Sequence, residues 1–238
     1  MKEMYEQKQK RARIILRRLK KQYGTDIGPF VNFSNPLELV MGTILSAQCT
    51  DDRVNAVTET LFARYRTAQD YADADIATLE MIIRPTGFYH QKARSLKETG
   101  RIIAEHFGGR VPNRVDDLLT LRGVSYKTAH LIMAKAYGQN TGVAVDTHVN
   151  RLTRRLELSV TQNPTNKGRE LAKLYLKKDY LNVNEYFIMH GRSVCKARKP
   201  QCKICILADL CPRANGKTVL PRARRVACAL GGNRTCRH

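Results

Sequence analysis

The chain has 238 residues, which is enough for one large domain or two smaller ones with a substantial core. Hydrophobic residues make up 42% of it, which excludes a disordered polycation, and no apolar run approaches the roughly 18 residues of a membrane span. A net charge of +21 predicts an anionic partner, and nucleic acid fits better than a cation-rich surface without a partner. With no secretory signal at its charged N-terminus, the protein is expected to be soluble and cytoplasmic, associated with the nucleoid through DNA binding.

Apolar residues recur three and four positions apart along nearly the whole chain, which is typical of amphipathic helices. No run with a period of two predicts a strand, so the expected fold class is all-α. We expect helices over 5–23, 35–48, 52–64, 73–83, 89–109, 114–120, 126–137, 147–157, 165–176 and 183–190. After residue 218 the chain carries five arginines and no carboxylate, which predicts a flexible basic tail over 219–238.

The segment 114–137 is predicted to form two helices joined by a tight turn, "LRGVS", at 121–125. The turn amides and the amino-terminal end of the second helix would point at one place, which suits a phosphate group. The alternative is an ordinary corner between two helices.

A lysine, Lys127, stands in the first turn of the second of these helices, which is otherwise apolar on nearly every face and is therefore expected to be buried. Burial and the positive end of the helix dipole would favour a neutral amine that can attack carbon. The alternative is a lysine that extends outward to a phosphate. Asp146, in "AVDTH", is predicted to cap the next helix. If it faces the same cleft as Lys127, it can stabilise positive charge and take up protons.

Four cysteines follow the spacing C-x6-C-x2-C-x5-C, which is too dense for the disulfide framework of a small secreted chain. They are Cys195, Cys202, Cys205 and Cys211. Four thiolates can hold a tetrahedral zinc ion or a [4Fe–4S] cluster, and the ligands alone do not decide between the two. Basic residues within this loop would offset the charge of the site or face phosphates. The other three cysteines, Cys49, Cys228 and Cys236, are scattered.

Five segments in this order resemble the endonuclease III family of helix–hairpin–helix DNA glycosylases. They are "LSAQCTDDRVN" (45–55), "TGFYHQKA" (86–93), "LRGVSYKTA" (121–129), "VDTH" (145–148) and the cysteine spacing. The resemblance covers roughly residues 28–215. It implies two helical lobes with a DNA-binding cleft between them. One lobe is a six-helix barrel over 29–139, and the other, formed by 1–28 and 140–218, carries a [4Fe–4S] cluster, with zinc as the alternative occupant. The sequence gives no sign of oligomerisation, so we expect a monomer.

The resemblance also implies an activity: a base-excision-repair glycosylase with AP lyase activity, which flips oxidised pyrimidines out of double-stranded DNA. Lys127 matches the family's nucleophile, which attacks C1′ and forms a Schiff base before β-elimination. Asp146 matches the assisting carboxylate. Related mismatch glycosylases carry tyrosine at the nucleophile position, but Thr128 and Ala129 anchor the register on Lys127 rather than on Tyr126. The adenine-excising branch is disfavoured, because its catalytic glutamate would fall near Gly42.

The remaining site residues are predicted to bind DNA. Gln48 matches the side chain that fills the gap left by the flipped base, and Phe88 falls where the family places a second wedge. The alternative for Phe88 is a core aromatic. Further DNA contacts are expected from Lys92, Arg122, Gly123, Ser125 and His148, the last with helix capping as an alternative, and Tyr126 is expected at the base pocket.

The hairpin departs from the family's usual Leu-Pro-Gly-Val-Gly at Arg122 and Ser125. Serine is strained there if the position needs a positive φ, and is otherwise a good helix cap. With Tyr126 close to the base pocket, we expect a lesion range that is altered, weaker or narrower than the family's. Two alternatives stay open: a monofunctional mismatch or uracil glycosylase, and a degenerate DNA-damage-binding protein.

Overall fold

The structure, a computed structural model, describes residues 3–24, 27–28 and 30–216. In these ranges the chain forms α-helices and short 3-10 helices without a β-strand, which confirms the predicted all-α class. None of the described helices is both long and apolar enough to cross a membrane. The predicted basic tail at 219–238 lies outside the described residues.

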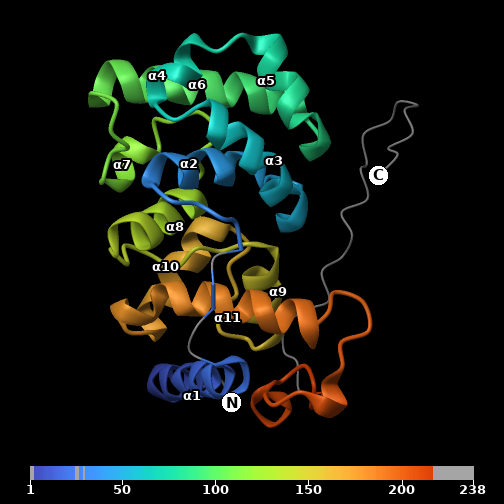
Figure 1. Ribbon diagram of the computed structural model, residues 1–238. Helices are drawn as coiled ribbons and strands as arrows, with labels where there is room; N and C mark the ends of the chain where they lie inside the picture. The colour runs from blue at the N-terminus through green and yellow to red at the C-terminus, as the bar shows by residue number, and fades with distance from the viewer. Residues whose placement is uncertain (1–2, 25–26, 29, 217–238) are drawn as a thin grey trace, which may run out of the picture.

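Seven helices surround a first hydrophobic core, whose buried members run from Val31 to Met133. They are α2 (Pro36–Leu45), α3 (Asp51–Arg64), α4 (Ala68–Asp73), α5 (Ile76–Ile83), α6 (Tyr89–Phe107), α7 (Val115–Leu118) and α8 (Tyr126–Tyr137), with the 3-10 helix η1 (Arg84–Thr86) between α5 and α6. In Figure 1 they form the upper part of the molecule, with α4, α5 and α6 outermost and α2 and α8 nearest the middle.

A second core joins the N-terminal helix to the last third of the chain. Its helices are α1 (Tyr5–Tyr23), α9 (Thr147–Arg155), α10 (Pro164–Leu174) and α11 (Tyr180–Ser193), followed by the 3-10 helices η3 (Cys202–Ile204) and η4 (Ala208–Leu210), while η2 (Lys177–Asp179) joins α10 to α11. Helix α1 packs against α10 and α11 and lies at the bottom of Figure 1. Two separate cores agree with a two-lobe organisation, whose boundaries at residues 28 and 139 stay a prediction.

The helix expected over 73–83 is α5, which begins at Ile76, and a separate helix that was not predicted, α4, precedes it. Helix α4 begins at a capping box, in which the Asp70 amide donates to the Thr67 hydroxyl and the Asp70 carboxylate accepts from the Thr67 amide. Asp75 then caps α5 by accepting from the Thr78 amide at 2.8 Å. Helix α4 is only six residues long, which is too short for a hydrophobic period to reveal it.

Helices α4 and α6 cross at Gly100, where a Cβ atom would lie 2.5 Å from Tyr71 Cβ and 2.8 Å from the Ala68 carbonyl oxygen. Gly100→Ala should therefore push α4 away from α6 and lower the free energy of unfolding by about 2–3 kcal/mol. Urea unfolding measures this, with Gly28→Ala as the control, because a Cβ there meets nothing within 4 Å. Equal midpoints for the two variants would contradict this packing.

Candidate active site

A cleft of about 530 Å³ opens between the two cores. Its walls come from α2, α3 and α8 on one side and from α11 and the start of α9 on the other. Lys127 and Asp146 both line it, so the structure brings together the two side chains that the sequence singled out as catalytic.

Lys127 reaches the cleft because α8 begins immediately before it. The Ser125 hydroxyl accepts a hydrogen bond from the Thr128 amide at 3.3 Å and caps the helix. Lys127, Leu131 and Lys135 stand four residues apart and line the cleft on one face of α8. Only the opposite face of the helix is buried in the core. The prediction of an entirely buried helix is therefore wrong, and Lys127 is half-buried at its open edge.

Asp146 is the N-cap of α9, as predicted. One carboxylate oxygen, Oδ1, accepts from the Val149 amide at 2.7 Å, which fixes the direction of the side chain. The buried residues 143–145 lead the chain up to this point and anchor it in the second core. The other carboxylate oxygen has no hydrogen-bond partner within the described ranges and is available to a bound molecule.

The other charged side chains that line the cleft are neutralised by ion pairs. Lys135 Nζ lies 2.7 Å from Glu185 Oε1 in a largely buried pair, and an Arg192 nitrogen lies 2.6 Å from Asp51 Oδ2. Both pairs join a helix of the first core to α11. Among the described residues, Lys127 and Asp146 are the only lysine, arginine or acidic side chains lining the cleft that form no ion pair. The site therefore offers one free amine and one free carboxylate.

His148 also lines the cleft, one residue beyond the first position of α9. Its Nδ1 lies 3.1 Å from the Arg151 guanidinium. Since a guanidinium can only donate, Nδ1 accepts and the neutral ring carries its proton on Nε2. Burial lowers the pKa of His148 more than the nearby Asp146 raises it. The capping position at the start of α9 is held by Asp146, so His148 does not cap this helix.

The hairpin turn between α7 and α8 lies beside the cleft. Gly123 has φ +88°, a conformation that favours glycine, and lies against Ile44 and Ser95. Ser125 has φ −92° and ψ 169°, which is ordinary extended backbone, so serine is an unstrained helix cap at this position. Arg122 is exposed, and its carbonyl accepts from the Thr99 hydroxyl at 2.8 Å, which ties the turn to α6.

Tyr126, which was predicted at the base pocket, does not line this cleft. Its ring packs edge-on against His130, with the ring centres 4.2 Å apart. Neighbouring residues of a helix point about 100° apart. Since Lys127 faces the cleft, Tyr126 is turned away from it.

Gln48 and Phe88 line a second, smaller groove of about 270 Å³, together with Gly123 of the hairpin. Both have a positive φ, 53° for Gln48 and 50° for Phe88, which is unusual for residues other than glycine and is common at functional sites. The Phe88 side chain is 65% exposed, which rules out the alternative of a core aromatic. Two exposed side chains on strained backbone thus flank one groove.

Lys92, which was predicted to contact DNA, lines the same smaller groove but reaches inward from it. The residue is only 5% exposed, and its ammonium group donates to the carbonyl oxygens of Leu45 at 2.8 Å and Thr86 at 2.9 Å. Its position in the first turn of α6 points the long side chain into the lobe rather than out of it. Nothing in the local sequence indicates the Leu45 carbonyl, 47 residues away, as a partner of Lys92.

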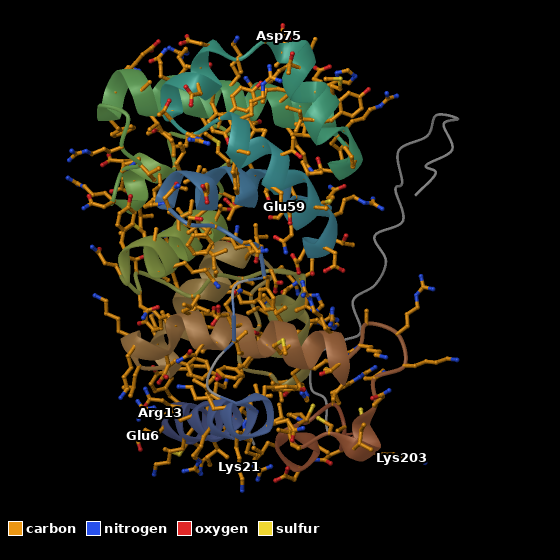
Figure 2. All side chains as sticks on the ribbon, viewed as in Figure 1. Glu6, Arg13, Lys21, Glu59, Asp75 and Lys203 are labelled. Carbon is orange, nitrogen blue, oxygen red and sulfur yellow. The ribbon has the colours of Figure 1, made fainter. Side chains whose placement is uncertain are left out.

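The four clustered cysteines follow α11 in a loop at the end of the molecule, where Lys203 projects outward (Figure 2). Burial raises the pKa of the Cys205 and Cys211 thiols, and the other cysteines of this group raise it further. A guanidinium nitrogen of Arg155 donates to Cys195 Sγ at 3.1 Å, which suits a thiolate ligand. Within the described part of the chain, no three candidate side chains converge on a single metal ion. Four thiolates are also the donor set of an iron–sulfur cluster, in which each binds a different iron atom.

The all-α fold, with a lysine and a carboxylate in one cleft beside a hairpin turn, is that of the helix–hairpin–helix DNA glycosylases. The model of the HhH-GPD superfamily of base excision DNA repair proteins matches residues 41–178, and that of the iron–sulfur binding domain of endonuclease III matches residues 195–211. The chain belongs to this superfamily and, within it, to the endonuclease III family, as its sequence predicted.

Its relatives cover nearly the whole chain. Endonuclease III of Synechocystis sp. is 47% identical over 208 residues, which are 87% of this chain and 94% of that protein. Two solved structures, a non-covalent endonuclease III–DNA complex and a trapped endonuclease III–DNA covalent intermediate, match with TM-scores of 0.83 at 35% identity. They cover 88% of this chain and 97% and 98% of their own. The protein is thus a DNA-binding base-excision-repair glycosylase with AP lyase activity and an iron–sulfur cluster.

Proposed function

We propose that this enzyme acts as a monomer on oxidised pyrimidines and abasic sites in double-stranded DNA, with Lys127 as nucleophile and Asp146 as the assisting carboxylate. The observation that supports this is the pairing of charges in the cleft. Lys135 and Arg192 are held by Glu185 and Asp51, so Lys127 is the amine that is free to react. A cleft of about 530 Å³ can accept an extruded nucleotide.

The proposed reaction begins when the lone pair of Lys127 Nζ attacks C1′ of the flipped nucleotide. The glycosidic bond breaks, and the base leaves with its electron pair and takes up a proton. After Nζ has lost a proton, the C1′–O4′ bond opens. O4′ keeps the electron pair and takes up a proton, which leaves a protonated Schiff base between C1′ and Nζ. Loss of a proton from C2′ expels the 3′ phosphate by β-elimination, and hydrolysis of the imine releases Lys127. Throughout, the carboxylate of Asp146 stabilises positive charge on the sugar and accepts protons.

Base extrusion is assigned to the smaller groove. Gln48 fills the gap left by the flipped base, and Phe88 enters the stack on the opposite strand as an apolar wedge. The amides around Gly123, with Arg122 beside them, hold a backbone phosphate. His148, which places a proton on Nε2 in the cleft, donates to a second phosphate. The side chains of Gln48 and Phe88 line the groove and are both exposed, as a wedge requires.

We assign the cluster as [4Fe–4S], held by Cys195, Cys202, Cys205 and Cys211. When bound, it ties the loop after α11 to the second core and keeps the basic side chains of that loop on one surface. Lys196, Arg198, Lys199 and Lys203 are all exposed there and can face phosphates. The assignment predicts that the purified protein is brown and contains about four iron atoms and no zinc per chain.

The experiment that tests the lesion class is a single-turnover assay on duplexes containing an oxidised pyrimidine, uracil or a mismatched thymine. We expect the oxidised pyrimidine to be released fastest and with strand cleavage. The hairpin sequence predicts that Ser125 and Tyr126 alter the lesion range, but Ser125 is unstrained and Tyr126 does not line the cleft. We therefore expect Ser125→Gly and Tyr126→Arg to keep the same order of lesions and to change each rate by no more than about threefold.

The placement of these two residues would be contradicted if the wild-type enzyme excised few lesions and either variant excised further lesions at least tenfold faster. Release of uracil or thymine without strand cleavage would instead support the monofunctional alternative.

A further inference from the structure

One buried lysine connects the two segments that carry Gln48 and Phe88. Leu45 is the last residue of α2, three positions before Gln48, and Thr86 is the last residue of η1, two positions before Phe88. The carbonyl oxygens of Leu45 and Thr86 both accept from Lys92 Nζ, at 2.8 and 2.9 Å. The backbone amide of Lys92 also donates to the Phe88 carbonyl at 3.1 Å. Three hydrogen bonds from one residue thus reach both wedge segments.

The position is costly for a cation. Lys92 is only 5% exposed, and burial lowers its pKa, whereas a methionine of similar size would fill the same space without a charge. The Leu45 carbonyl lies at the C-terminal end of a helix, where it has no helical partner and carries partial negative charge. Lys92 satisfies this carbonyl and the one before the second wedge at the same time.

The backbone at both wedges needs such support. Gln48 and Phe88 adopt φ values of 53° and 50°, and residues other than glycine remain there only when their surroundings hold them. Both side chains are exposed and line the same groove, so their spacing is set by the backbone beneath them rather than by packing of the side chains.

We infer that Lys92 is a positioning residue for base extrusion, which fixes the spacing and direction of Gln48 and Phe88 so that both enter the duplex together. The inference rests on the proposed wedge roles of those two residues. Lys92 lines the groove but is only 5% exposed, so it acts through the two wedge segments rather than on the reacting atoms. Its loss therefore slows the extrusion of a stacked base and spares the chemistry on an abasic site in single-stranded DNA, where nothing has to be unstacked.

The test compares Lys92→Met with Lys97→Met in the full-length protein. Lys97 stands on the same helix, is half-buried and donates to a single carbonyl, that of Ala74 at 2.6 Å, away from the wedges. Extrusion is followed by the fluorescence of 2-aminopurine placed opposite an oxidised pyrimidine, together with single-turnover excision. Borohydride trapping on a single-stranded abasic oligonucleotide reports folding and chemistry.

For Lys92→Met we expect extrusion and excision on the duplex to fall about ten- to a hundredfold, the scale on which small misplacements act. Trapping on the single strand should stay within about threefold of wild type, and Lys97→Met should match wild type in every assay. Adding Lys92→Met to a Gln48→Ala/Phe88→Ala protein should have little further effect, because residues that act through one another are not additive.

Wild-type extrusion by Lys92→Met would overturn the inference, and so would an equal loss on both substrates, which is the pattern of a purely structural residue. Full additivity with the wedge variant would overturn it too. If the Gln48→Ala/Phe88→Ala protein extruded the base at the wild-type rate, the proposed wedge roles themselves would be wrong. This result differs from each of those that overturn only the role of Lys92.

Discussion

Lys127→Ala should bind duplex DNA and lose strand cleavage by a factor on the order of 10⁴ or more, as expected when a covalent nucleophile is removed. No second amine can substitute for it within the described cleft. Lys135, two turns further along α8, is held 2.7 Å from Glu185 in a largely buried pair, and Arg192 is held by Asp51. Single-turnover cleavage of an abasic duplex measures the loss.

Lys135→Ala is the matched control, because it removes a lysine from the same face of the same helix. It leaves Glu185 as a buried carboxylate without its partner and should lower stability, yet it should retain the covalent reaction with DNA. If Lys135→Ala abolished the reaction and Lys127→Ala did not, the assignment of the nucleophile would be wrong.

Asp146→Asn should reduce excision of a damaged base by about 10²- to 10⁴-fold with little change in thermal stability. The asparagine amide oxygen can still accept from the Val149 amide, so the cap of α9 is kept while the negative charge is lost. The loss should be larger for base excision than for cleavage of a preformed abasic site, because the carboxylate stabilises the charge that develops when the base leaves. Parallel assays on the two substrates measure the difference.

Asp146→Ala separates the two roles of this residue. It removes the cap as well as the charge and should cost about 1 kcal/mol of stability beyond Asp146→Asn, at a similar loss of activity. Normal excision by Asp146→Asn would show that the carboxylate only caps the helix, which was the simpler interpretation of its position in the sequence.

Much of the helical framework was predictable because its signals are local. The bounds expected for the helices at 5–23 and 126–137 agree with α1 and α8, each of which combines a clear apolar period with a glycine at its C-terminal end. Helix α4 was missed because its signal is a capping box rather than a period. The open face of α8 was also unpredictable, since Lys127, Leu131 and Lys135 on it line a cleft that only the packing of the two cores creates.

Some features of the site were likewise predictable from the sequence and others were not. The resemblance supplied Lys127, Asp146, Gln48 and Phe88, and the structure places each pair in one cleft or groove. The resemblance could not predict the direction of Tyr126, because this depends on how α8 is rotated to place Lys127 in the cleft. It also could not predict the carbonyl partners of Lys92.

The ion pairs across the cleft could not be predicted from the sequence either. Lys135 and Glu185 are 50 residues apart, and Asp51 and Arg192 are 141 residues apart, so only the packed fold brings them together. These pairs decide which amine in the cleft is free, and no motif in the chain marks them.

The most direct test of the account is to incubate the wild-type enzyme with an abasic duplex and borohydride, digest the product and map the modified peptide by mass spectrometry. Reduction of the Schiff base leaves the sugar fragment attached to the amine that attacked it. The account predicts a single adduct on Lys127. An adduct on any other amine, or no adduct from a folded, DNA-binding enzyme, would contradict it.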